Sequence, residues 1–114
     1  AIDSIYPKEN KNLANRIIED WGVVISEYGP GEETSKESFV LRNRIISGLS
    51  LAVVFIEAPE TSGALATARF AGEQGRGVFV VPGSIDDPNY AGSHALIRDG
   101  AILVTSVEEV LSEI

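Results

Sequence analysis

The segment Leu51-Ala52-Val53-Val54-Phe55-Ile56, followed by Glu57, is the longest uninterrupted apolar run of the chain. Its β-branched and aromatic side chains are typical of a strand that is buried on both faces. We therefore predict a central parallel strand over residues 51–56. A turn of small residues follows at 58–63, and a helical pattern over 63–74 comes next, with Ser62 as its expected N-cap.

The rest of the sequence alternates helical patterns with short apolar runs. Further strands are predicted at residues 23–26, 78–81 and 101–104, and further helices at residues 10–21, 37–48, 94–100 and 106–114. Gly22 is the expected end of the first helix. Such alternation requires parallel strands joined by helical crossovers, so the predicted fold is a Rossmann-like three-layer α/β/α sandwich with a mostly parallel sheet.

The beginning of the chain is unusual for this fold class. A doubly wound domain usually starts with a strand, whereas this chain starts with a turn and a helix. We therefore expect residues 1–114 to form a single, partial domain that lacks its N-terminal strands.

Composition excludes several classes of site. The 114 residues include no cysteine and one histidine, which excludes disulfides and thiolate metal sites and leaves little for zinc. We expect no metal and no cofactor. A net charge of −8 argues against a general nucleic-acid coat, although a local basic pocket on an acidic body stays open. With no bilayer-length apolar run and no signal peptide, we expect a cytoplasmic protein without membrane contact.

Arg42, Asn43 and Arg44 form the most basic segment. Arginine suits phosphate because it is always charged and binds in a bidentate way. Two arginines two residues apart on a helix point about 200° from each other, so they reach different groups. Two interpretations stay open: contact with phosphates, or one arginine over the surface and the other paired with an acid such as Glu37.

Lys36 and Phe39 lie just upstream of the arginines. An aromatic ring beside a cation can stack a base and hold its phosphate. Alternatively, Phe39 belongs to the core, on the side of the helix expected to face inward with Leu41, Ile45 and Ile46.

The turn at Ser62 and Gly63 is a candidate phosphate cradle. Backbone N–H groups at the start of a helix attract anions, and Ala64 and Thr67 fall within its first turns. Pro82 and Gly83 end the next strand and would lie on the same sheet edge. The pattern is neither a Walker A loop nor a dinucleotide fingerprint, and a plain strand-to-helix turn explains Gly63 equally well.

Two further residues have alternative roles. Glu57 at the end of the central strand is either a general base or an acceptor of hydrogen bonds from the following turn. His94 has no adjacent acid or nucleophile pattern, so a capping or surface position is expected.

Taken together, the sequence blocks identify a family. YPKEN, ISEY, LRNRIISGLS, VVFIEA, SGALATAR, GRGVFVVPGS and GSHALIRDGAILV follow one another with characteristic spacing. In this order they resemble the DNA-processing protein A (DprA, or Smf) family along nearly the whole chain.

The resemblance implies a non-catalytic Rossmann-like protein that binds and protects single-stranded DNA during natural transformation. It also implies a homodimer that loads the RecA recombinase. Carried onto this chain, the DNA site comprises Lys36, Phe39, Arg42, Arg44 and the Ser62-Gly63 turn. The chain departs from the family pattern at Gly29 and Val40, where proline is usual, at Thr61, where many members are basic, and at His94, where asparagine is usual.

Two alternatives come from other classes. Enzymes of the lysine-decarboxylase-like (LOG) type hydrolyse nucleoside monophosphates on a similar fold, and Glu57 with Gly63 would then be the reacting groups. Their PGGxGTxxE signature is absent from this sequence. The other alternative is a folded remnant with no activity of its own.

Overall fold

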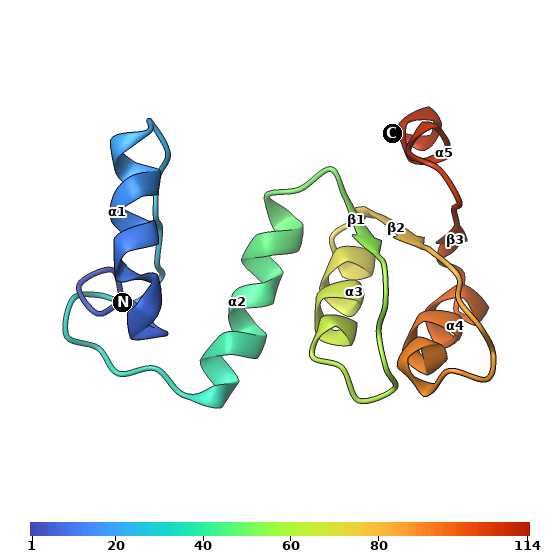
Figure 1. Ribbon diagram of the computed structural model, residues 1–114, viewed down its shortest axis with the longest axis horizontal. Helices are drawn as coiled ribbons and strands as arrows, with labels where there is room; N and C mark the ends of the chain where they lie inside the picture. Colours follow the sequence, from blue (N-terminus) through green and yellow to red (C-terminus); the bar gives the residue numbers. More distant parts are fainter. The chain divides into compact units, whose positions relative to one another are not determined.

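The computed structural model describes residues 1–114, which form two compact units, residues 1–36 and residues 37–114 (Figure 1). In the first unit a short 3-10 helix, η1 (Lys8–Asn10), leads directly into α1 (Lys11–Glu19). No residue of α1 is buried. The assignment of residues 1–114 to one partial domain stays a prediction.

The first helix ends at Glu19 with Asp20 as its C-cap, so the prediction that Gly22 is the helix-terminating glycine is wrong. The left-handed residue is Trp21, with φ of 68°. The Gly22 N–H donates to the Ile17 carbonyl oxygen at 2.8 Å. A Cβ at position 22 would lie 2.7 Å from that same oxygen, so a larger residue would push the turn open.

The predicted strand over residues 23–26 is wrong. This segment has no strand hydrogen bonding, and the side chains of Val23 and Ile25 are 74% and 61% exposed. An extended segment becomes a strand only by pairing with a neighbour, and residues 1–36 contain no strand that could pair with it. The apolar pattern alone does not supply that neighbour.

The second unit contains the sheet and most of the helices. Its strands are β1 (Ala52–Phe55), β2 (Gly77–Val80) and β3 (Ile102–Leu103). Its helices are α2 (Lys36–Gly48, which begins at the boundary), α3 (Ala64–Glu73), the 3-10 helix η2 (Pro88–Tyr90), α4 (Ala91–Arg98) and α5 (Val107–Glu113). None of the helices combines the length and apolar character that crossing a bilayer requires.

All three strands are parallel, in the order β1-β2-β3, with α3 and α4 as the crossovers. This arrangement confirms the predicted Rossmann-like α/β class. The position of the first strand was predicted incorrectly, because β2 is central and β1 has a neighbour on one side only. Accordingly Phe55 is buried while Val54 is 40% exposed, so β1 is not buried on both faces. An apolar run indicates burial but does not fix a strand's place in the sheet.

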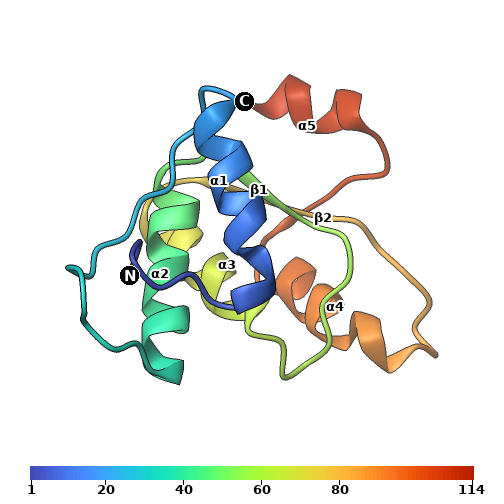
Figure 2. The ribbon, with the colours of Figure 1, turned by 60° about the vertical axis from the view of Figure 1, so that its left-hand side comes forward.

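One face of the sheet carries the core beneath α3 and α4 (Figure 2). Phe55 and Val80 point to this face and pack with Ala68 of α3. Leu96 and Ile97 of α4 pack against the same cluster. Because residues two apart on a strand share a face, Val53 and Val78 lie on the same side as Phe55 and Val80 and complete this cluster.

Candidate nucleic-acid interface

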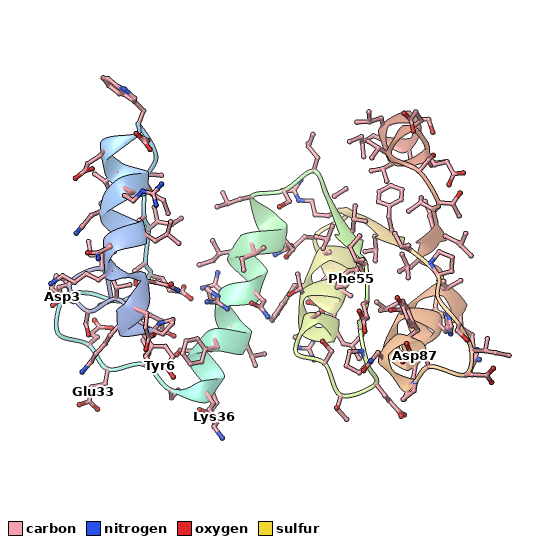
Figure 3. All side chains as sticks on the ribbon, viewed as in Figure 1. Asp3, Tyr6, Glu33, Lys36, Phe55 and Asp87 are labelled. Atoms are coloured by element: carbon pink, nitrogen blue, oxygen red, sulfur yellow. The ribbon has the colours of Figure 1, made fainter.

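The first half of α2 presents an exposed aromatic ring and a guanidinium together. Phe39 is 38% exposed, and the Arg42 Cζ lies 5.7 Å from the centre of its ring. This is the range of a cation–π contact, formed here across one helical turn. Lys36 is exposed at the first residue of the same helix (Figure 3). Lys36, Phe39 and Arg42 therefore all lie on α2. One helix can thus present a ring that stacks a base and cations that contact its phosphates.

Asn43 and Arg44 continue this segment differently. The Arg42 guanidinium donates to Asn43 Oδ1 at 3.4 Å, which holds these two side chains together. Arg44 is exposed, and two positions along a helix direct it to another side, as the spacing predicts. Arg42 and Arg44 therefore cannot bind one common phosphate from an undistorted helix.

The side of α2 expected to face inward is largely exposed, which corrects the prediction. Leu41 and Ile46 are 49% and 47% exposed, and Phe39 is not in the core. The buried residues of this helix are Ser38 and Ser47 instead. Small polar residues occupy the contact side because α2 is held by hydrogen bonds at its end, as described next, rather than by an apolar seam.

A polar latch, formed by Ser47, Gln74 and Arg76, joins the end of α2 to the end of α3. The Ser47 hydroxyl donates to Gln74 Oε1 at 2.6 Å, and Gln74 Nε2 donates to the Arg44 carbonyl at 2.7 Å. The Arg76 guanidinium donates to the Gly48 carbonyl at 2.6 Å. The Gly48 carbonyl is the last of α2 and has no partner within the helix, so Arg76 satisfies one of the acceptors that a helix C-terminus leaves open.

Since the two helices are joined at their C-terminal ends, their first turns lie together at the other end of the unit (Figures 1 and 3). β1 ends at Phe55, and the loop of residues 56–63 continues the chain to that end, where α3 begins. The Phe39 to Arg42 segment and the Ser62-Gly63 turn therefore lie on separate elements at the same end of residues 37–114.

Several hydrogen-bonding groups of the Ser62-Gly63 turn bond to each other within the turn. Gly63, and not Ser62, is the N-cap residue of α3, while Ser62 Oγ accepts the Ala64 N–H at 3.1 Å. The N–H groups of Leu65 and Ala66 close back on the carbonyls of Ser62 and Gly63. What the turn presents to an anion is the Gly63 N–H and the Ser62 hydroxyl proton.

The other members of the predicted cradle are less accessible. Thr67 is buried, and the Ala64 N–H is already taken by Ser62. The Gly83 N–H points to His94 Nε2 at 3.4 Å, next to the half-buried Pro82. In this conformation these four residues support the turn rather than face a ligand.

Two residues whose hydrogen bonds hold the elements around the candidate site were not singled out by the sequence analysis. Gln74 was placed at the end of a helix without a role, and Ser93 of α4 is fully buried against Ala58 in the β1–α3 loop. Neither partner is close in sequence, so no local pattern indicates these contacts.

Glu57 and His94, for which the sequence left alternative roles, lie in different environments: Glu57 is exposed and His94 is half-buried. Glu57 is exposed at the end of β1. His94 is half-buried in α4, where its ring stacks on Tyr90 with a centroid distance of 6.3 Å and it accepts from Gly83. His94 therefore supports the loop after β2 rather than capping a helix. No group of three histidine, cysteine or acidic side chains is arranged to hold a metal ion.

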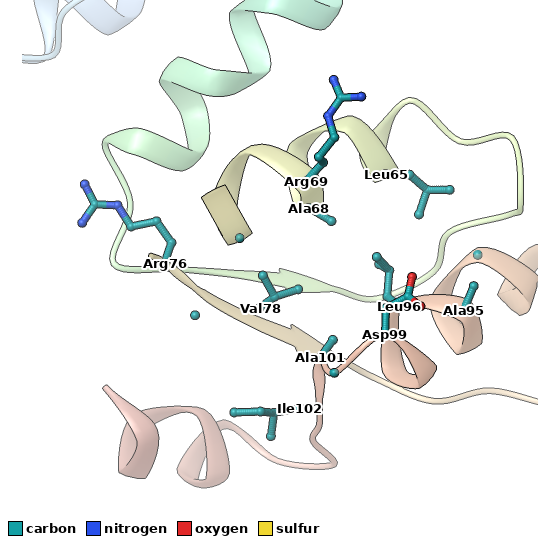
Figure 4. A pocket seen from close by; sticks show the side chains of 14 residues that line it. Leu65, Ala68, Arg69, Arg76, Val78, Ala95, Leu96, Asp99, Ala101 and Ile102 are labelled. Carbon is teal, nitrogen blue, oxygen red and sulfur yellow. The ribbon is translucent and has the colours of Figure 1, made fainter. Parts of the chain in front are cut away.

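An apolar groove of about 640 Å³ lies between α3, α4 and the strands β2 and β3 (Figure 4). Its walls include Leu65, Ala68, Leu96 and Ala101, with Arg69 at its rim. The groove is separate from the exposed ring and guanidinium of α2. Its lining also includes the charged side chains of Arg69, Arg76 and Asp99.

Comparison with known proteins gives the family. The model of the family described as DNA recombination-mediator protein A matches residues 1–114. The chain belongs to this family. The resemblance found in the sequence blocks is thereby confirmed along the whole chain.

Relatives in this family are similar in sequence and in structure. The DNA processing protein DprA of Streptococcus pneumoniae is 51% identical over 113 residues, which cover 99% of this chain and 40% of that protein. Its solved structure matches with a TM-score of 0.84 and 47% identity, covering 100% of this chain and 40% of that chain. Protein Smf of Escherichia coli is 45% identical and covers 100% of this chain and 30% of its own length.

A solved structure of DNA processing protein A from Helicobacter pylori matches with a TM-score of 0.83 at 28% identity. The match covers 99% of this chain and 52% of that chain, and the structure is described for its unique single-stranded DNA binding mode. The chain thus spans well under two thirds of the length of each of these relatives.

Proposed function

We propose that this chain is part of a protein that binds single-stranded DNA, with the first half of α2 and the Ser62-Gly63 turn as its contacts. The observation that carries the proposal is the exposed Phe39 ring with Arg42 5.7 Å from its centre. A ring face suits a base of any sequence, and a guanidinium beside it suits the phosphate. Membership of the recombination-mediator family and the Helicobacter pylori structure support the same ligand.

The roles of the site residues follow from their chemistry. Phe39 stacks a base, while Lys36 and Arg42 contact phosphates on either side of it. Arg44, with Asn43 beside it, reaches a different phosphate, because it points to another side of the helix. The Gly63 N–H and the Ser62 hydroxyl donate to one further phosphate oxygen. Ala64, Thr67, Pro82 and Gly83 shape the turn and its surroundings.

The proposal includes a biological setting. Binding is non-catalytic and protects DNA that enters the cell during natural transformation, and the bound strand is passed to the RecA recombinase by a homodimer. The family description as a recombination mediator supports the recombinase step, because a mediator delivers DNA to a recombinase.

Substitution of the arginines tests the proposal. In the full-length protein as the organism makes it, Arg42→Ala and Arg44→Ala should each weaken binding of a labelled oligo-dT. Each should also reduce the slope of log K against log salt by about 0.7, the contribution of one phosphate on a single strand. Fluorescence anisotropy at several salt concentrations measures both quantities.

A matched control is Arg98→Ala, which removes an equal charge from the exposed last residue of α4. Its salt slope should equal that of the wild type. If the slopes of all three variants equal the wild-type slope, Arg42 and Arg44 are structural, and the proposed contacts on α2 are wrong.

A further inference from the structure

We propose that Ser93 is a positioning residue of the DNA site, which fixes the β1–α3 loop and thereby orients the Ser62-Gly63 turn toward phosphate. The inference rests on the proposed function. Ser93 itself lies on α4, is fully buried and does not reach a ligand. Its effect is transmitted through the backbone of residues 58–63.

The contact between Ser93 and Ala58 is a closed pair of hydrogen bonds. Ser93 Oγ accepts the Ala58 N–H at 2.9 Å, and the Ser93 N–H donates to the Ala58 carbonyl at 2.9 Å. The hydroxyl also approaches that carbonyl at 3.5 Å. Both residues have 0% exposure, so water cannot replace these bonds. One side chain therefore satisfies a loop amide that has no alternative partner.

Gly92 permits this close approach. A Cβ at position 92 would lie 2.8 Å from the Ala58 carbonyl oxygen and closer still to that of Pro59. Both obstacles are backbone atoms that cannot rotate away. Only glycine lets the start of α4 lie directly against the loop.

The fixed end of the loop determines where its other end lies. The Ser62 N–H donates to the Pro59 carbonyl at 3.1 Å, so the segment from Pro59 to Ser62 forms a closed turn directly after the fixed Ala58. Ser62 Oγ then accepts the Ala64 N–H at 3.1 Å. Gly63 is exposed, and these bonds are made by the N–H groups on either side of it, so in our proposal the Gly63 N–H is the donor to phosphate. If the loop shifts at Ala58, this donor shifts too.

The test is Ser93→Ala in the full-length protein, measured by anisotropy with labelled oligo-dT at several salt concentrations. Loss of one hydrogen bond to a charged group predicts roughly tenfold or more weaker binding. The salt slope should fall by about 0.7, as for one lost phosphate contact. Amide hydrogen exchange should be faster at Ala58 than in the wild type, because its acceptor is gone.

The matched control is Ser106→Ala, which also removes a hydroxyl that accepts a backbone N–H, that of Glu109 at the start of α5. It should lower stability without changing DNA affinity or salt slope. This separates positioning of the site from general destabilisation.

The outcomes distinguish the inference from the proposed function. Faster exchange at Ala58 with wild-type affinity and salt slope would overturn the positioning role while leaving DNA binding intact. Absence of salt-sensitive binding by the wild type would overturn the proposed function itself, and the inference with it. If Ser93→Ala does not fold, Ser93→Cys fills the site with a slightly larger atom that is a weaker acceptor, and wild-type affinity of that variant overturns the inference.

Discussion

Among single residues, Phe39 offers the clearest test of whether α2 binds DNA or has only a structural role. Its ring is 38% exposed and lies beside Arg42. We expect Phe39→Ala to weaken oligo-dT binding by about 1 to 3 kcal/mol, the usual worth of one base stacked on an aromatic ring. Phe39→Tyr should restore most of that loss because it keeps a ring. Anisotropy titration gives the affinities.

The control for this prediction is Leu41→Ala on the same helix, where the side chain is 49% exposed. It removes apolar area of similar exposure without removing a ring, so DNA affinity should stay near the wild-type value. Urea unfolding of both variants should show small losses of stability. If Phe39→Ala lowered the free energy of unfolding by several kcal/mol and left the affinity for oligo-dT unchanged, Phe39 would have a structural role and not a binding role.

The kinds of residue in the site were predictable from sequence, but their supports were not. The residue type alone indicates that an arginine can bind phosphate and that a phenylalanine can stack a base, so Arg42 and Phe39 could be identified without a structure. The role of Ser93 depends on an amide 35 positions away. In the sequence, a serine near the start of a helix looks the same whether its hydroxyl caps the helix or bonds to a distant loop. The sequence therefore predicted only capping near Ser93.

At the scale of elements, the latch between α2 and α3 determines where the arginine helix lies. Gln74 bonds to the Ser47 hydroxyl at 2.6 Å and to the Arg44 carbonyl at 2.7 Å. Gln74→Ala removes both bonds, and at about 0.5 to 1.5 kcal/mol each the loss of stability should be about 1 to 3 kcal/mol. Urea unfolding followed by circular dichroism measures it.

Glu73→Ala is the comparison variant, because Glu73 is the neighbouring exposed residue at the end of the same helix. It should change stability by less than about 0.5 kcal/mol, as is usual for surface substitutions. Equal stability of the Gln74 and Glu73 variants would show that the latch does not hold α2 in solution.

Helices were predicted better than strands for a physical reason. Helices α2 and α3 make their hydrogen bonds internally, so local spacing and end residues fix them within about a residue. Strands need partners elsewhere in the chain. Residues 23–26 carry an apolar strand pattern yet have no partner, and β1 carries the most apolar run yet lies at the edge of the sheet.

Over the whole of the given chain, the net charge of −8 opposes an anionic ligand, so binding by these residues has to come from a local basic group. The helix α5 contributes to that negative field with Glu108 and Glu113, and it lies at the end of the unit opposite to the first turns of α2 and α3 (Figure 1). Charges this far from the site act only through the long-range field.

The effect of the long-range negative field on binding can be distinguished from that of direct phosphate contacts, because the two depend differently on salt concentration. The screening length is about 30 Å at 10 mM salt and about 8 Å at 150 mM. Joint replacement of Glu108 and Glu113 by glutamine should therefore tighten oligo-dT binding at 10 mM salt and leave it unchanged at 150 mM. Arg42→Ala should weaken binding at both concentrations, because a direct phosphate contact persists at short range. An effect of the glutamine replacements that is as large at 150 mM would mean that α5 lies against the DNA, and the site would then extend beyond α2 and the Ser62-Gly63 turn.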